Sequence, residues 1–99
     1  MYDMANLKKM KAMTDAAPDL MAAFKSFDAA AFAEGALSVK VKELIAVAVA
    51  VTTQCPYCIE IHAKRAKAAG ASEAELTEAT LVAAAIRAGG VVTHATHAL

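Results

Sequence analysis

Apolar residues recur along the chain at spacings of three and four, which is the period of an amphipathic α-helix. Four of them lie among lysines near the N-terminus: Met4, Leu7, Met10 and Met13. They predict a first helix of about three turns, which the segment from Asp15 to Pro18 ends. Pro18 suits the first turn of a second helix, which we expect to run toward Glu34 and to end at Gly35.

The middle of the chain is more apolar than its beginning. Ser38 is a suitable N-cap for a third helix, which we expect from Val39 to about Thr53. Residues 44–51 are apolar on every side, which is typical of a buried central helix. The valines of this run would also suit a buried strand, but its length and the lack of alternation favour a helix.

Clear start and stop signals mark the next two helices. We expect a fourth helix to begin at Cys55-Pro56 and to end at Gly70. Ser72 and Glu75 have the spacing of a capping box and predict a fifth helix through about Ala88.

The last helical segment contains two consecutive glycines. We expect Gly89-Gly90 to bend or interrupt the fifth helix before a final segment from Val91 to Ala98. No repeat, linker or low-complexity tail divides the 99 residues. The sequence therefore predicts one all-α domain over residues 1–99, a bundle of five to six helices.

The composition bears on assembly and on partners. Hydrophobic residues make up 59% of the chain, more than a small domain can bury alone, and this predicts a homo-oligomer. Ten basic and ten acidic side chains balance, so no nucleic acid is expected as a partner.

The longest apolar run, Leu44 to Val51, is too short to span a bilayer. The N-terminal residues do not resemble a signal peptide, so we expect a cytoplasmic protein without membrane contact.

The two cysteines lie three residues apart in Cys55-Pro56-Tyr57-Cys58. With Pro56 in the first helical position, Cys55 would be the N-cap and Cys58 the third residue of the helix. The positive end of the helix dipole would then favour the thiolate form of both cysteines. Two thiols at this spacing can close a disulfide with little backbone motion, although they would also suit an ordinary helix start.

Two further side chains are candidates for proton transfer. His62 follows Cys58 by four residues, so both project from one face of the helix and the imidazole can accept the thiol proton. Glu43 precedes Cys55 by twelve residues, and an acidic residue early in a helix is also common for electrostatic reasons alone. Antiparallel packing of the third and fourth helices would place Glu43 far from the cysteines, and a crossed arrangement would bring it close.

A metal site is an alternative use of the same residues. Cys55, Cys58 and His62 could supply three zinc ligands, with Glu43 or His94 as the fourth. A structural zinc site normally has a second pair of ligands at matching spacing, which the sequence lacks, so we expect neither a metal nor another cofactor.

A second group of basic residues lies near the C-terminus. Arg87, His94 and His97 suit the negative end of a helix dipole, which is the favoured interpretation. The alternative is that one histidine reaches the active site of a neighbouring subunit.

Together, Glu43, the Cys55–Cys58 segment and His62 resemble the signature of the carboxymuconolactone decarboxylase superfamily. More narrowly they resemble its alkyl hydroperoxidase D-like (AhpD-like) branch, which keeps the cysteine pair. The resemblance covers about residues 38–98 and includes the Gly89-Gly90-Val91-Val92 stretch. It implies an all-α fold and assembly into trimers or hexamers.

The resemblance also implies roles for these residues. Cys58 would react with peroxide to give a sulfenic acid, which Cys55 would resolve as a disulfide. Glu43 and His62 would form a proton relay, and a dithiol such as a lipoyl-bearing partner would reduce the pair again. Tyr57 departs from the pattern, because the best-studied type of member has histidine immediately before the second cysteine. Tyrosine is a poor proton acceptor near neutral pH, so the relay would be shorter or would run through water.

Three functions follow as hypotheses. The first is a thiol-dependent peroxidase or disulfide reductase, a peroxiredoxin-type antioxidant enzyme. The second is a non-enzymatic oligomeric redox sensor or adaptor, and the third is an inert structural domain. Decarboxylation of a lactone is less expected, because the decarboxylase branch lacks the cysteine pair.

Overall fold

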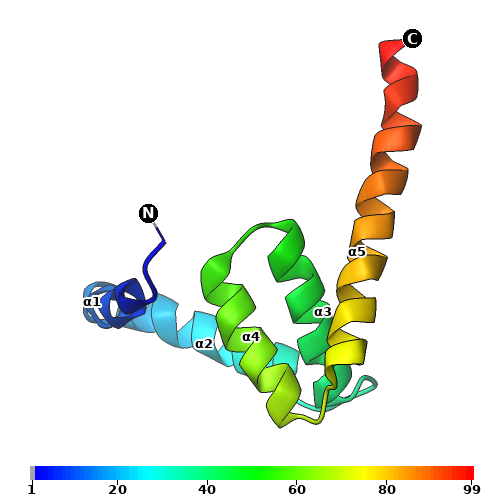
Figure 1. Ribbon diagram of the computed structural model, residues 1–99. Coiled ribbons are helices and arrows are strands. Elements are labelled where there is room, and N and C mark those ends of the chain that lie inside the picture. Colours follow the sequence, from blue (N-terminus) through cyan, green and yellow to red (C-terminus); the bar gives the residue numbers. More distant parts are fainter. Residues whose placement is uncertain (1) are drawn as a thin grey trace.

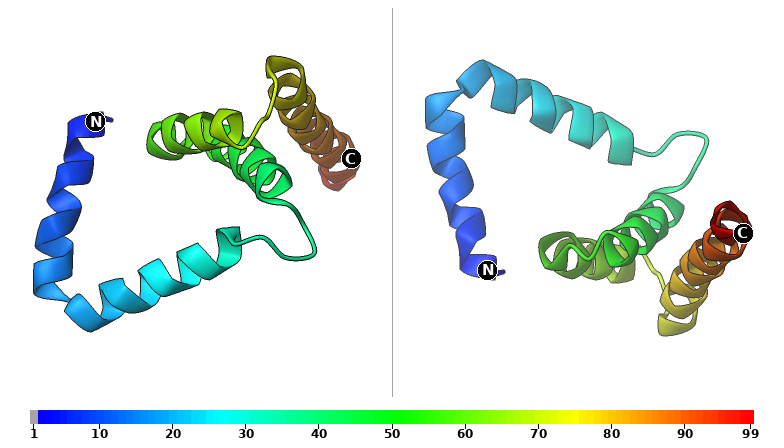
Figure 2. Two further views of the ribbon diagram at one scale, coloured as in Figure 1. Left: turned by 90° about the horizontal axis from the view of Figure 1, so that it is seen from below. Right: turned by 90° about the horizontal axis from the view of Figure 1, so that it is seen from above.

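The computed structural model describes residues 2–99, and these residues form helices and no strand. The all-α fold predicted from the sequence is thus confirmed. Seven helical segments follow one another along the chain: η1 (Met4–Lys9), α1 (Met10–Ala16), α2 (Pro18–Phe32), α3 (Val39–Thr52), α4 (Pro56–Ala68), α5 (Glu73–His94) and η2 (Ala95–Ala98). Helices α3 and α4 lie side by side as an antiparallel hairpin, and α5 begins beside α3 and then projects away from it (Figure 1). Helices α1 and α2 form an angled arm on the other side of the hairpin (Figure 2).

Polar caps begin two of the helices where the sequence predicts them. The Ser38 hydroxyl accepts a hydrogen bond from the Val41 amide at 3.2 Å and caps α3. The Ser72 hydroxyl accepts from the Glu75 amide at 3.1 Å, and the Glu75 carboxylate accepts from the Ser72 amide at 2.9 Å. This reciprocal pair satisfies amides that have no partner within the helix. The capping box predicted for α5 is confirmed.

The N-terminal half differs in detail from the expectation. The first helix starts as the 3-10 segment η1 and becomes α-helical only at Met10. Helix α2 ends at Phe32, before Glu34, because Ala33 adopts an extended conformation. The Lys42 ammonium group donates to the Ala33 carbonyl, and this bond satisfies one of the free carbonyls at the end of α2.

The two glycines near the C-terminus do not interrupt α5, so the expected bend is wrong. The helix continues through Gly89 and Gly90 to His94. The Thr93 hydroxyl bonds back to the Gly89 carbonyl at 2.9 Å, as side chains do within a continuous helix. A glycine in a helix interior costs only about 1 kcal/mol relative to alanine, too little to end a helix of good helix formers.

The core of a single chain is small and lies around the hairpin. Val47, Ala66 and Ala71 are buried together, with apolar residues of α3, α4 and α5 packed against them. Helix α3 is central but is not buried on every side, since Ile45 is 47% and Val49 is 55% exposed. The expectation of a fully buried third helix is therefore not met within one chain.

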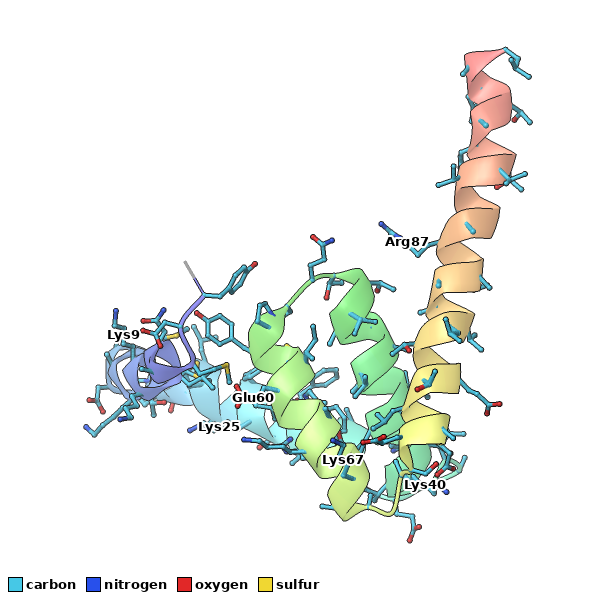
Figure 3. The ribbon with its side chains drawn as sticks, viewed as in Figure 1. Lys9, Lys25, Lys40, Glu60, Lys67 and Arg87 are labelled. Carbon is cyan, nitrogen blue, oxygen red and sulfur yellow. The ribbon has the colours of Figure 1, made fainter. Side chains whose placement is uncertain are left out.

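Most of α5 has no neighbour within the chain. None of its residues is buried, and five large apolar side chains along it are more than half exposed: Leu81, Val82, Ile86, Val91 and Val92. In Figure 3, the distal half of α5 stands free with side chains around it, and Arg87 projects toward the side on which α3 and α4 lie. The segment Glu73–Ala98 is long and apolar enough to cross a membrane by length and composition, which is weak evidence by itself.

The exposed surface is larger than that of a compact protein of this size. The accessible surface is 7236 Å², whereas a compact monomer of this mass would expose about 5,300 Å². The radius of gyration is 16.5 Å, against about 13 Å for a compact domain of this length. One chain thus leaves about 1,900 Å² more surface in water than a compact fold would.

Candidate functional site

The cysteine pair lies at the N-terminus of α4, with the geometry that the sequence predicts. Pro56 is the first helical residue and Cys55 is the N-cap. The Cys55 sulfur accepts a hydrogen bond from the Cys58 amide at 3.4 Å. The two sulfurs are 3.0 Å apart, and both cysteines are free thiols. The two thiols therefore lie in contact at the positive end of the helix.

The two thiols differ in acidity. The hydrogen bond with the Cys58 side chain lowers the pKa of Cys55, and the backbone amides of Cys58 and Tyr57 lower it further. The same side-chain bond raises the pKa of Cys58, and partial burial adds to that rise. The shared hydrogen bond thus favours the thiolate at Cys55 and the thiol at Cys58.

His62 and Glu43 form the second part of the site. The Nδ1 atom of His62 lies 2.7 Å from the Oε2 atom of Glu43. Glu43 is only 3% exposed, and a carboxylate only accepts hydrogen bonds, so the hydrogen of this bond belongs to Nδ1. The Nε2 atom is the ring nitrogen that does not face Glu43.

The hairpin explains the position of Glu43. Helices α3 and α4 are antiparallel, so Glu43 lies beside His62, farther from the helix turn than the cysteines. Within residues 2–99, Glu43 bonds to His62 and to neither cysteine. A carboxylate twelve residues before the motif can therefore act on it only through the imidazole.

A cavity connects the two parts of the site. Its volume is about 590 Å³, and side chains of α2, α3 and α4 surround it. Cys58 and His62 both line it, and most of the remaining wall is apolar. Phe32 lies in the same wall with its ring stacked on the imidazole of His62, at a centroid distance of 4.8 Å and an interplanar angle of 13°. Of the two cysteines, Cys58 is thus the one that faces the cavity.

Tyr57 lies apart from this cavity. Its hydroxyl accepts hydrogen bonds from the Asn6 side-chain amide at 3.2 Å and from the Asp3 backbone amide at 3.4 Å. Its ring packs edge-on against Tyr2, with the centroids 5.6 Å apart. The residue that replaces the histidine of the motif therefore contacts the N-terminal segment.

Polar side chains close the turn before the cysteines. The Thr52 and Thr53 hydroxyls both donate to the Val49 carbonyl, at 2.8 and 3.0 Å, and so satisfy a carbonyl at the end of α3. Gln54 has a φ of 55°, a left-handed conformation that is uncommon outside glycine. It is not among the residues that line the cavity.

The sequence did not identify Phe32 as part of the site. It lies thirty residues before His62 and belongs to another helix. Its apolar spacing on α2 indicates only a helix face, so no signal in one sequence separates it from a core phenylalanine.

The other basic residues lie elsewhere. The rings of His94 and His97 are 5.5 Å apart near the far end of α5. Between residues 2 and 99, no three histidine, cysteine or acidic side chains are arranged to bind a metal ion. The zinc site considered from the sequence therefore has no geometric support within one chain.

Comparison with known proteins gives the same architecture and names a family. The sequence model of the carboxymuconolactone decarboxylase family matches residues 18–99. A Paracoccus denitrificans protein named "Uncharacterized protein 4 in cox locus" is 51% identical over 77 residues, which are 78% of this chain and 69% of that protein.

Two crystal structures are similar in fold and sequence. A protein from Methanobacterium thermoautotrophicum has a TM-score of 0.81 and 39% identity, over 88% of this chain and 98% of that one. The apo form of a carboxymuconolactone decarboxylase family protein from Legionella pneumophila has a TM-score of 0.77 and 36% identity, over 91% of this chain and 80% of that one. The protein described here belongs to the carboxymuconolactone decarboxylase family.

Proposed function

We propose that this protein is a thiol-dependent peroxidase or disulfide reductase of the AhpD-like type. One observation carries the proposal. Cys58 lies 3.0 Å from Cys55 and shares a cavity wall with His62, whose imidazole is bonded to the buried Glu43. A disulfide-forming pair, a proton acceptor and a space for substrate are thus together in one place.

The first step is the reaction of Cys58 with a peroxide. His62 accepts the proton of the Cys58 thiol at Nε2, and Glu43 stabilises the resulting imidazolium. The thiolate attacks the peroxide, so that a sulfur–oxygen bond forms while the oxygen–oxygen bond breaks. The proton returns to the departing oxygen, which leaves as an alcohol or as water. Cys58 is then a sulfenic acid.

The second step closes the disulfide. Cys55 gives up its thiol proton, and the resulting thiolate attacks the sulfur of the sulfenic acid. A sulfur–sulfur bond forms while the sulfur–oxygen bond breaks, and the departing hydroxide takes up the proton from Cys55 to become water. Two thiols and one peroxide have then given a disulfide, an alcohol or water, and one further water.

The disulfide must be reduced before the next turnover. A dithiol can do this in two exchange steps through a mixed disulfide. A lipoyl-type dithiol in the cytoplasm is our proposed reductant, by analogy with the AhpD-like branch. No metal or other cofactor takes part in this scheme.

We also propose that the working form is a homo-oligomer, a trimer or hexamer. The excess surface of about 1,900 Å² per chain is more than the roughly 800 Å² that each partner buries in a standard interface. A membrane is the other environment that could cover the apolar α5. The small packed core of α3 and α4 favours further copies of the chain, because they would also cover Ile45 and Val49, which lie outside α5.

A second candidate is a redox sensor or adaptor without turnover. It is supported by Tyr57, which lies between the cysteines and binds the N-terminal segment through its hydroxyl. Disulfide formation would alter the first turn of α4 and so could change the position of this segment. This candidate predicts a change in assembly on oxidation and very slow turnover with any donor.

The test is peroxide consumption with dihydrolipoamide as the reductant. We expect the wild-type protein to consume peroxide and Cys58→Ser to lose this activity. Cys55→Ser is the matched control, because it should still form a sulfenic acid, which a dimedone probe would trap, but no intramolecular disulfide. Unchanged consumption by Cys58→Ser would overturn the proposal.

A further inference from the structure

The contact between Phe32 and His62 joins the arm to the redox site. Phe32 is the last residue of α2 and is half-buried. Its ring lies nearly parallel to the imidazole at 4.8 Å. The rest of α2 diverges from the hairpin (Figure 2), so this end of the helix is where the arm meets the site.

The stack complements the hydrogen bond from Glu43. That bond holds one edge of the imidazole through Nδ1 at 2.7 Å, but it leaves the ring free to tilt about the bond. An aromatic ring on the face of the imidazole restricts this tilt. The hydrogen bond sets the tautomer and the stack restricts the ring plane, so together they determine where the Nε2 atom lies.

The ring of Phe32 also responds to the charge of the imidazole. When Nε2 accepts a proton, the imidazole becomes a cation directly against the π-face of Phe32. A cation is attracted to the negative face of an aromatic ring. The contact between Phe32 and His62 is therefore stronger after the proton transfer than before it. Because the ring stabilises the protonated imidazole more than the neutral one, it favours transfer of the proton from Cys58 to His62.

The position of Phe32 is itself fixed by α3. The Lys42 ammonium group donates to the carbonyl of Ala33, the residue after Phe32. Lys42 directly precedes Glu43 in the sequence. Two consecutive residues of α3 thus hold the end of α2 and the edge of the imidazole.

From these contacts we infer that Phe32 is a positioning residue, which fixes the ring plane of His62 for proton transfer from Cys58. The role of Phe32 in proton transfer rests on the proposed function. Its effect on the orientation of the His62 ring does not. The experiment therefore measures the two separately.

The test compares Phe32→Leu and Phe32→Tyr with Phe24→Leu as the matched control. Phe24 lies on the same helix, is 54% exposed and does not line the cavity. The first measurement is the orientation of the His62 ring, from nuclear Overhauser contacts of its carbon-bound protons in NMR spectra of the reduced full-length protein. The second is the rate of Cys58 oxidation by peroxide as a function of pH.

We expect Phe32→Leu to change the Overhauser contacts that define the ring plane of His62, while the Nδ1 bond to Glu43 is kept. We also expect it to slow Cys58 oxidation by about two- to tenfold, the factor that aromatic stacking energies correspond to, and to change the shape of the pH profile. Phe32→Tyr, which keeps the stack, should behave like the wild type, and so should Phe24→Leu.

Two results would overturn the inference. One is an unchanged orientation of the His62 ring in Phe32→Leu, and the other is equal effects of Phe32→Leu and Phe24→Leu on both measurements. A changed ring orientation in a protein whose wild type does not react with peroxide would support the positioning of His62 and would reject the proposed peroxidase function.

Discussion

The α3–α4 hairpin and helix α5 are both rich in apolar residues, yet they differ in what one chain provides for them. The hairpin buries Val47 and Ala50 almost completely and encloses the hydrogen-bonded pair of Glu43 and His62. Helix α5 is longer and begins beside α3, yet none of its residues is buried. One chain thus completes the hairpin, while it leaves much of the apolar surface of α5 in water. The proposed chemistry lies in the first region and the proposed assembly in the second.

The largest effect should come from placing charge on α5. We expect the double variant Val82→Asp/Ile86→Asp to dissociate the proposed oligomer, because two carboxylates one turn apart cannot be buried without partners. Analytical ultracentrifugation without detergent measures this. Glu78→Lys, at an exposed polar position of the same helix, is the control and should leave the oligomer intact.

This prediction also tests the difference between the two regions. A wild-type protein that is monomeric in solution would contradict the assembly, and so would a double variant that sediments like the wild type. Extraction of the wild type only with detergent would indicate that a bilayer covers α5.

The next effect concerns the buried pair in the hairpin. Glu43→Ala removes the partner of an imidazole that is only 14% exposed, so we expect a loss of about 1–3 kcal/mol in the free energy of unfolding. Glu43→Gln keeps a hydrogen-bond acceptor without the charge, so it should preserve most of the stability and lower the turnover by about tenfold or more. Urea denaturation and the peroxide assay separate these outcomes. Equal turnover in Glu43→Gln and the wild type would remove Glu43 from the relay.

The smallest effect is a shift in the reactivity of Cys55. The pKa of Cys55 is below its ordinary value chiefly because of the bond with Cys58. Cys58→Ala should therefore raise this pKa, so that the thiolate fraction and the rate of iodoacetamide alkylation at neutral pH both fall. Cys55→Ala should lower the pKa of Cys58, since its bond with Cys55 is the main cause of the rise.

The alkylation rate of each variant is measured as a function of pH, with mass spectrometry to confirm the modified residue. In Cys58→Ala the midpoint for Cys55 should move to higher pH, and in Cys55→Ala the midpoint for Cys58 should move to lower pH. Identical midpoints in the single variants and the wild type would show that the two thiols are not coupled.

Local signals in the sequence predicted much of the fold and part of the site. Ser38, Ser72 and Pro56 mark helix starts because capping depends on a few neighbouring atoms. The placement of Cys55 as N-cap and Cys58 in the first turn follows from the same rules, and the structure confirms it. The expected break at Gly89-Gly90 is wrong because glycine lowers helix stability only slightly, and neighbouring residues outweigh it.

These local signals could not predict contacts between helices. The sequence left open whether Glu43 lies near the cysteines, and the antiparallel hairpin places it beside His62 instead. Phe32 gave no signal at all, since its stack on His62 depends on where α2 ends and how Lys42 holds that end.

The sequence by itself determined the helices, the cysteine pair at a helix start and the position of His62 one turn later, because each depends on residues within a few positions of one another. Only the tertiary structure decided that Cys58 faces the cavity, that Glu43 bonds to His62, that Phe32 covers the imidazole and that apolar side chains of α5 stay exposed. These features depend on how separate helices pack, and packing is set by contacts between residues that are distant in the sequence.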